Sequence, residues 1–292
     1  MVNDICTSPT TTILIRTKNE AKYIGKTLDI LNNQSIKPNE IIVVDSGSTD
    51  GTVEIVKQRS DIKLIQISPE EFTFGGSLNI GFKAATGEII LLLSAHAFPY
   101  DQHWLQNMVK HFDDQKVAGV YGKQLPQPDA WPTVERDHLM CYKDEIRIQT
   151  DPDNIKEHSF SNANSAIRRL CWEKHNFDEI LPACEDREWA VTMLKMGYKI
   201  IYEPSAAVYH SHNESLLKVY RRIYKEIIGL QSIYQLRVGR FYVIKNWATS
   251  VLADFCFIVK NKKRKFWLLR VPIYRLFWSY GFLRASFSKN VK

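Results

Sequence analysis

The sequence predicts an α/β fold in which a mostly parallel sheet carries flanking helices and is followed by amphipathic helices at the C-terminus. Short apolar segments alternate with helical patterns across residues 11–122, which is typical of strand–helix–strand units. Among them, residues 89–93 are apolar at every position, as expected of a strand buried on both faces. From residue 255 onward, ten Lys or Arg and ten aromatic residues occur without an Asp or Glu, so the end of the chain has a different character.

The order of the elements follows from the hydrophobic periodicity. Strands are predicted at residues 12–17, 41–45, 63–67, 89–93 and 117–122, and helices at 21–34, 52–59, 78–85 and 101–112. Later elements are expected as helices at 134–148, 185–196 and 216–236, and a strand at 199–202. The pattern divides the chain into a domain of residues 1–214, with halves of about 11–124 and 125–214, and a helical region of residues 215–292.

Charge and cysteine usage narrow the class of protein. The net charge is +7, but residues 1–254 hold 29 basic and 32 acidic side chains, so the excess is confined to the C-terminal region. The crevice segments show no basic stripe, which argues against nucleic acid as a partner. The five cysteines are odd in number and have no C-x-x-C spacing, which indicates a reducing compartment rather than a disulfide framework. We expect no signal peptide and no membrane-spanning stretch.

Polar residues follow the predicted strands where each one ends. Because the carboxyl ends of parallel strands meet at one edge of a sheet, we expect these side chains to converge on one ligand crevice. They are Thr17, Lys18, Asn19, Asp45, Ser46 and His96.

Four stretches carry a family resemblance. In chain order they are TILIRTKNEAKYIGKTLDILNNQS, EIIVVDSGSTDGT, FGGSLNIGFKAATGEIILLLSAHAFP and EDREWAVTMLKMGYKIIYEPSAAVYHSH. Together they resemble family 2 glycosyltransferases of the GT-A fold, which is Rossmann-like, and within that family the bacterial rhamnosyltransferase-like members. An aspartate-rich turn by itself is common, whereas four motifs in this order are specific. The resemblance covers about residues 11–234 and implies a nucleotide-sugar donor.

The resemblance gives Asp45 the task of recognising the donor base, through hydrogen bonds from a base imide to its carboxylate. An N-cap or turn role is the alternative for Asp45, since D-S-G-S is turn chemistry. The other residues expected to bind the nucleotide sugar are Thr17, Asn19, Glu20, Ser46, Asn79, Ser94 and Ala95.

A histidine stands where most relatives place the last carboxylate of an acidic metal motif. Here the strand at 89–93 is followed by Ser94, Ala95 and His96, and a neutral imidazole is a competent metal ligand. The resemblance places the rest of the metal site at His210 or His212, of which only one is expected to reach the ion. Imidazole ligands favour Mn²⁺ over Mg²⁺. The alternative is that His96 donates directly to a phosphate oxygen.

The motif ACEDREWA begins a predicted helix, and the resemblance makes Asp186 the general base and Glu185 its support. Capping acids are common at helix starts, so a purely structural role is the alternative. Lys123, Gln124, Asn162 and Asn164 are expected to contact the acceptor, although 161–165 equally fits an ordinary loop.

The leading hypothesis is an inverting glycosyltransferase that acts on a glycan or lipid-linked acceptor in surface polysaccharide synthesis. The basic and aromatic C-terminus predicts contact with an anionic membrane from the cytoplasmic side, with helix packing against the domain or a partner as the alternative. A non-catalytic sugar-nucleotide-binding protein is the second hypothesis. A sugar nucleotidyltransferase is the third, and it is disfavoured because no glycine lies in residues 16–19.

Overall fold

The computed structural model describes residues 9–154, 160–235 and 239–288, which leaves Cys6 and the predicted helix end at Leu236 outside the described residues. The chain forms two compact units. The N-terminal unit comprises residues 1–124, 144–179 and 186–210, and the C-terminal unit comprises residues 125–143, 180–185 and 211–292. The second unit therefore takes in two segments that precede the predicted boundary at residue 214.

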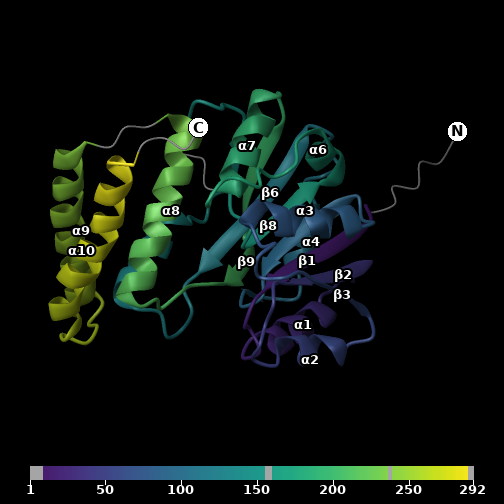
Figure 1. Cartoon of the computed structure of the whole chain (residues 1–292), viewed down its shortest axis with the longest axis horizontal. Helices are drawn as coiled ribbons and strands as arrows, with labels where there is room; N and C mark the ends of the chain where they lie inside the picture. The colour runs from purple at the N-terminus through teal and green to yellow at the C-terminus, as the bar shows by residue number, and fades with distance from the viewer. Residues whose placement is uncertain (1–8, 155–159, 236–238, 289–292) are drawn as a thin grey trace, which may run out of the picture. The chain divides into compact units, whose positions relative to one another are not determined.

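A mixed sheet forms the centre of the N-terminal unit (Figure 1). The strand order is β3-β2-β1-β4-β8-β6-β9-β5, and β7 also pairs with β9. The strands β1, β2, β3 and β4 pair in parallel, whereas β8 is antiparallel to both β4 and β6. Their bounds are β1 Thr11–Thr17, β2 Glu40–Asp45, β3 Ile62–Gln66, β4 Ile89–Ser94, β5 Phe98–Pro99, β6 Val117–Leu125, β7 Arg147–Gln149, β8 Asn164–Arg168 and β9 Lys199–Tyr209. The predicted mostly parallel α/β fold is confirmed.

Helices cover both faces of this sheet. Alternate strand residues such as Ile13, Leu91 and Leu93 join the residues of α1, α2 and α4 in one core. On the opposite face Leu14 meets α3, where a Cβ added to Gly81 would lie 2.4 Å from the Leu14 side chain. The helices of this unit are α1 Ile24–Asn32, α2 Thr52–Lys57, α3 Phe74–Ala84, α4 Trp104–Val109, α6 Arg169–Lys174 and α7 Glu185–Lys195.

Three sequence predictions were wrong in detail. The helix predicted over residues 134–148 ends at Cys141, and β7 follows because its residues gain ladder partners on β9. The strand expected at 199–202 continues to Tyr209, where it pairs with β5. The third helix begins at Phe74 rather than residue 78, since the Thr73 hydroxyl caps it by accepting a hydrogen bond from the Gly76 N–H at 2.9 Å.

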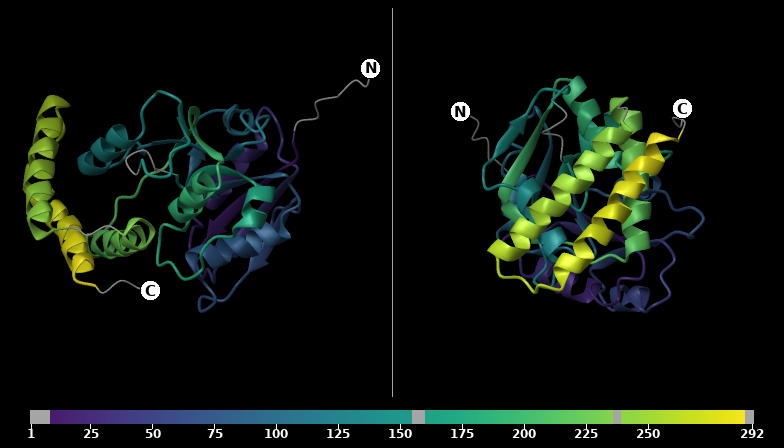
Figure 2. Two further views of the ribbon diagram at one scale, coloured as in Figure 1. Left: turned by 90° about the horizontal axis from the view of Figure 1, so that it is seen from above. Right: turned by 90° about the vertical axis from the view of Figure 1, so that its left-hand side faces the viewer.

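The C-terminal unit is helical, with α5 Pro132–Cys141, α8 Leu216–Tyr234, α9 Arg240–Lys260 and α10 Trp267–Ser286. Helices α9 and α10 lie side by side (Figure 2). Buried Val251, Ile258 and Val271 pack between them, and a second core joins α8 to α10 through Ile223, Tyr274 and their neighbours.

An ion network ties α5, α9 and α10 together. Arg275 donates to the fully buried Asp254 at 2.7 Å and to Asp137 at 2.8 and 2.9 Å, and Arg136 lies 2.9 Å from Asp254. By length and composition alone, Phe241–Lys260 passes as a membrane-spanning helix, contrary to the expectation that no such stretch exists. Asp254 lies within this stretch and is held by two guanidinium groups inside the unit.

Candidate functional site

The carboxyl ends of the parallel strands bring the predicted crevice residues to one edge of the sheet. Thr17 pairs in register with Asp45, and Arg16 pairs with Ser94. Ser46 is buried and donates to the Thr17 carbonyl through both its N–H and its hydroxyl, each at 3.1 Å. The Thr17 hydroxyl is also buried and has no hydrogen-bond partner among the described residues. It is a polar group that a ligand at this edge would satisfy.

Two loops are fixed against each other above this edge. Asp45 is fully buried, and its carboxylate accepts from the N–H groups of Gly47 at 3.1 Å and Ser48 at 2.9 Å and from the Ser48 hydroxyl. Asn19 adopts a positive φ of 57° and accepts from the Thr49 N–H at 2.8 Å. The structure thus gives Asp45 the turn-fixing role, and its contact with a donor base stays a prediction.

His96 lies beyond the end of β4 and is oriented by a carboxylate. Its Nδ1 is 2.9 Å from Oε1 of Glu20, and the two side chains are 18% and 20% exposed. Donation from Nδ1 to this carboxylate places the ring lone pair on Nε2. A carboxylate–histidine pair of this kind is the usual support for a metal-binding imidazole. Ala95 is buried beside it, and its carbonyl accepts from the Thr27 hydroxyl at 2.7 Å.

His210 stacks on His96. The two ring centroids are 4.9 Å apart with an angle of 19° between the planes. The Nδ1 of His210 lies 2.8 Å from Oε1 of Gln124, so this imidazole too is oriented through Nδ1 by a side-chain oxygen. Gln124, predicted to contact the acceptor, therefore positions His210.

His212 lies two residues after His210 and belongs to the C-terminal unit, whose last segment starts at residue 211. Its side chain is exposed. Two residues of extended chain span at most about 7 Å. Covalent connection alone therefore keeps His212 close to His210.

The two histidines fit a divalent metal. One ring nitrogen of His96 and one of His210 lie within 4.8 Å of each other, which matches two ligands of one ion. Both rings have an oxygen acceptor at Nδ1, so both present Nε2 as the ligand nitrogen. Imidazole nitrogen suits Mn²⁺ and later transition metals better than Mg²⁺, which prefers oxygen.

Asp186 stands in the first turn of α7 and accepts from two backbone N–H groups, those of Asn162 at 3.1 Å and Arg187 at 2.8 Å. Burial raises the pKa of the Asp186 carboxyl above its usual range, and the hydrogen bonds and the charges of Arg187 and Arg16 only partly offset this. Glu185 is the first residue of α7 and is buried. The Asp186 side chain is partly exposed, and its raised pKa makes the ionised carboxylate a stronger base.

One short segment connects His96 with Asp186. The N–H of Ser94, two residues before His96, donates to the Ala163 carbonyl at 3.1 Å. Asn162, the residue before Ala163, donates its N–H to Asp186 at 3.1 Å. The Asn162 side-chain amide nitrogen is buried without a hydrogen-bond partner in the described part of the chain. The contact of Asn162 with a sugar hydroxyl stays a prediction, and its amide nitrogen is a donor available for it.

The structure gives Asn79 and Asn164 roles within the fold, and the ligand contacts expected of them stay predictions. The Asn79 amide donates to Phe177 and Glu179, and its oxygen accepts from Trp172 and the Phe177 N–H, so its hydrogen-bonding capacity is filled within the fold. Asn164 is fully buried and joins three elements, since its oxygen accepts from Trp104 and its amide donates to the carbonyls of residues 123 and 206. Lys123 forms an ion pair with Asp144.

A family model described as Glycosyl transferase family 2 matches residues 12–173, which include the crevice edge, His96 and the segment that reaches Asp186. The chain belongs to glycosyl transferase family 2. The O-antigen chain rhamnosyltransferase RfbN of Salmonella typhimurium is 32% identical to this glycosyltransferase over 219 residues, 73% of this chain and 70% of the relative. WbaN of Salmonella anatum, also described as an O-antigen chain rhamnosyltransferase, is 33% identical over 197 residues, 65% of this chain and 62% of the relative.

Solved structures show the same fold. The mannosyltransferase PcManGT from Pyrobaculum calidifontis, in complex with GDP-Man and Mn²⁺, superimposes with a TM-score of 0.66 at 20% identity over 97% of this chain and 89% of its own. Staphylococcus aureus TarS 1–349 with UDP-GlcNAc gives a TM-score of 0.55 at 19% identity over 77% of this chain and 67% of its own.

Two functional features of this glycosyltransferase were missed in the sequence. Glu20 was expected to bind the nucleotide sugar, and its contact with His96 was not foreseen. Arg16 was not singled out, yet its charge lowers the pKa of Asp186, so it lies in the same electrostatic environment. Its guanidinium donates to the Phe74 carbonyl at 2.7 Å and packs over the Phe74 ring. The sequence did contain a signal for Arg16, because a basic residue stands near the end of the central strand β1.

The raised pKa of Asp186 predicts a specific effect on stability. The folded state binds the proton more tightly than the unfolded chain, so wild-type stability is full below the unfolded pKa and falls as pH rises through the folded pKa. Each unit of pKa difference corresponds to about 1.4 kcal/mol. The free energy of unfolding of Asp186→Asn, relative to wild type, should therefore rise with pH over this interval in urea titrations.

Asp50→Asn provides a control of opposite sign. The Thr52 hydroxyl and neighbouring N–H groups lower the pKa of Asp50, so its stabilisation is present above the unfolded pKa and is lost on acidification. The stability of Asp50→Asn relative to wild type should fall as pH rises. If the stability of Asp186→Asn relative to wild type stayed constant or fell as pH rises, the raised pKa of Asp186 would be wrong.

Proposed function

We propose that this glycosyltransferase catalyses inverting transfer of a deoxyhexose, with rhamnose as the leading candidate, from a nucleotide-diphosphate donor to a glycan or lipid-linked acceptor in surface polysaccharide synthesis. The sugar and pathway are suggested by the two O-antigen rhamnosyltransferases that resemble the chain. The observation that carries the proposal is that one segment bonds both sides of the site: its Ala163 carbonyl accepts from Ser94, two residues before His96, and its Asn162 N–H donates to Asp186.

Asp186 acts as the general base. Its carboxylate removes the proton of the acceptor hydroxyl while that oxygen bonds to the anomeric carbon and the bond from this carbon to the diphosphate oxygen breaks. Attack on the face opposite the leaving group inverts the configuration. Burial raises the pKa of Asp186, which makes its ionised carboxylate a stronger base. The N–H groups of Asn162 and Arg187 fix the direction of the carboxylate.

The diphosphate is held through His96 and His210. A divalent metal bound to these imidazoles would supply the positive charge that a nucleoside diphosphate needs as a leaving group. The donor set favours Mn²⁺ over Mg²⁺, and the Mn²⁺ in the PcManGT complex supports a divalent metal in this fold. Arg16 adds a fixed cation at the same edge of the sheet.

The C-terminal unit provides a membrane-facing surface, here called the α9–α10 face. Exposed apolar residues recur at helical spacing on each helix, as in a helix that lies in a membrane interface. They are Phe241, Ile244, Leu252 and Val259 on α9, and Leu269, Ile273, Leu276 and Tyr280 on α10. The connection between the helices carries exposed Lys262, Arg264 and Lys265. We infer peripheral binding to the cytoplasmic surface of an anionic membrane.

The base assignment is tested with Asp186→Asn. Transfer should fall by about 10²–10⁴-fold, because the variant cannot accept the acceptor proton. Donor binding, measured by calorimetry, should stay within about twofold, because the donor contacts lie elsewhere. Glu188→Gln is the control on the same helix, since Glu188 pairs with His175 and should be dispensable for transfer. Wild-type turnover by Asp186→Asn would overturn the assignment, and so would donor binding without turnover by the wild-type protein.

The metal assignment is tested by Mn²⁺ titration with electron paramagnetic resonance. His96→Ala and His210→Ala should each weaken Mn²⁺ binding at least about tenfold, and Glu20→Gln and Gln124→Ala should act in the same direction by losing the groups that orient the rings. His103→Ala is the control, because His103 is an exposed histidine in the same unit. Full transfer activity in EDTA would favour direct donation from His96 to phosphate and remove the metal.

Membrane binding is tested by flotation with phosphatidylcholine vesicles, with and without an anionic phospholipid. The protein should float with anionic vesicles only, and less so at high salt, which screens the basic residues. Leu269→Glu combined with Leu276→Glu should abolish flotation. Leu170→Glu is the control, since Leu170 is 64% exposed in the N-terminal unit. Equal effects of the two changes would remove the α9–α10 face from the proposal.

A further inference from the structure

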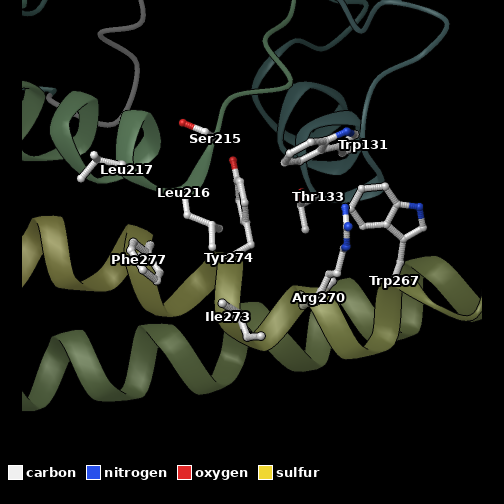
Figure 3. Close-up of a pocket in the computed structure, with 11 residues that line it drawn as sticks. Trp131, Thr133, Ser215, Leu216, Leu217, Trp267, Arg270, Ile273, Tyr274 and Phe277 are labelled. Carbon is white, nitrogen blue, oxygen red and sulfur yellow. The ribbon is translucent and has the colours of Figure 1, made fainter.

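The C-terminal unit contains a cavity of about 670 Å³ among α5, α8 and α10 (Figure 3). This volume is typical of a site for a small organic ligand. Its walls are largely aromatic and aliphatic, with Trp131, Trp267 and Leu216 among them. The rings of Trp131 and Trp267 pack against each other with centroids 5.4 Å apart. An apolar chain is therefore the best match for most of the wall.

Two polar groups break this apolar lining. The Thr133 hydroxyl is buried and has no hydrogen-bond partner among residues 9–154, 160–235 and 239–288, and its residue is 1% exposed. Arg270 also lines the cavity and packs over the Trp267 ring at 5.7 Å. Figure 3 shows Thr133 and the Arg270 guanidinium directed toward the same part of the cavity. An unsatisfied buried hydroxyl next to a cation is a site for an anionic oxygen.

Arg270 differs from Arg275, on the same helix, in the acidic residues that surround it. Arg275 is buried and is neutralised by Asp254 and Asp137. In the part of the chain that the structure describes, no carboxylate lies within ion-pair distance of Arg270. The Tyr274 hydroxyl also borders the cavity, and burial raises the pKa of Tyr274 to about 12, so it remains a donor at neutral pH. The polar end of the cavity is thus built from donors.

The cavity borders the α9–α10 face. Ile273 lines the cavity and is also 51% exposed within the apolar stripe of α10. Leu217, at the start of α8, lines it as well and is 49% exposed. Because Ile273 belongs to both, an apolar chain can enter the cavity from the surface that we propose to contact lipid.

We propose that this cavity binds the lipid carrier of the acceptor, an isoprenoid phosphate, with the chain between the two tryptophans and the phosphate oxygens on Arg270 and Thr133. The proposal rests on the proposed function, because it identifies the lipid part of that acceptor. A free nucleotide does not fit, since the lining offers one unpaired cation and a mostly apolar wall. A two-chain phospholipid would leave its second chain without a comparable wall.

The test is calorimetric titration of the full chain with farnesyl phosphate below its aggregation concentration. Farnesol and inorganic phosphate each carry half of the recognised chemistry and should bind at least about tenfold more weakly, because a charge-assisted hydrogen bond is worth about 1.5–3 kcal/mol. Dodecyl phosphate separates an isoprenoid site from a general acyl site. Equal affinity for farnesol and farnesyl phosphate, or for dodecyl and farnesyl phosphate, would overturn the proposal.

Matched variants locate the site. Arg270→Gln should weaken farnesyl phosphate binding about 10–100-fold, and Thr133→Val should weaken it less because the lost group is neutral. Arg284→Gln is the control, since Arg284 is an exposed arginine on the same helix that does not line the cavity. Ile273→Trp should fill the cavity and reduce binding while the far-UV spectrum stays unchanged. Equal effects of Arg270→Gln and Arg284→Gln would assign the binding to general surface charge.

Donor hydrolysis by the same protein separates this proposal from the proposed function. Hydrolysis of the donor without binding of farnesyl phosphate would overturn the cavity assignment and leave the glycosyl transfer intact. Binding of farnesyl phosphate without any turnover of a donor would support the cavity as a lipid site and overturn the transfer reaction instead.

Discussion

The site depends on how one short segment, residues 161–165, is held inside the sheet. Asn164 makes this possible, because its fully buried side chain satisfies groups from α4, β6 and β9 at once. β6 can approach so closely only because residue 122 is glycine, where a Cβ would lie 2.0 Å from the Ala206 carbonyl oxygen. With Asn164 fixed, the preceding residues present one carbonyl to Ser94 and one N–H to Asp186. The imidazole side and the carboxylate side of the site are therefore positioned by the same backbone.

Much of the donor half of the fold was predictable from the sequence because parallel strands leave a strong local signal. Residues 41–45 and 89–93 are continuous apolar runs, and their register brings Thr17 and Asp45 together. The antiparallel half was harder to predict. Strand β8 begins with the fully buried Asn164, whose side chain is satisfied by Trp104 and by the carbonyls of residues 123 and 206, all distant in sequence. Such long-range hydrogen bonds have no periodicity, so Asn164 and Asn79 were taken for ligand contacts.

The histidine at the end of β4 illustrates the same limit in the site itself. The sequence identified His96 and His210 as candidates by position, and the structure stacks their rings. The sequence could not reveal that Glu20 orients His96 and that Gln124 orients His210, because the partners lie 76 and 86 positions apart. An acidic metal motif needs little such support, whereas an imidazole has two different nitrogens and must be held in one tautomer. A metal bound to these histidines would therefore depend on Glu20 and on Gln124 of β6 as well as on its ligands.

The buried ion network of the C-terminal unit opposes insertion of α9 into a bilayer. Helix α9 has the length and composition of a transmembrane segment, but Asp254 in its interior is held by Arg275 and Arg136. Inserting the helix would strip these partners from a carboxylate, which costs about 2.5–3.5 kcal/mol at a helix centre before the lost packing is counted. The network therefore acts as a tether that keeps α9 in its bundle. If the α9–α10 face contacts lipid as we propose, this tether limits the contact to the surface of the bilayer and leaves it reversible.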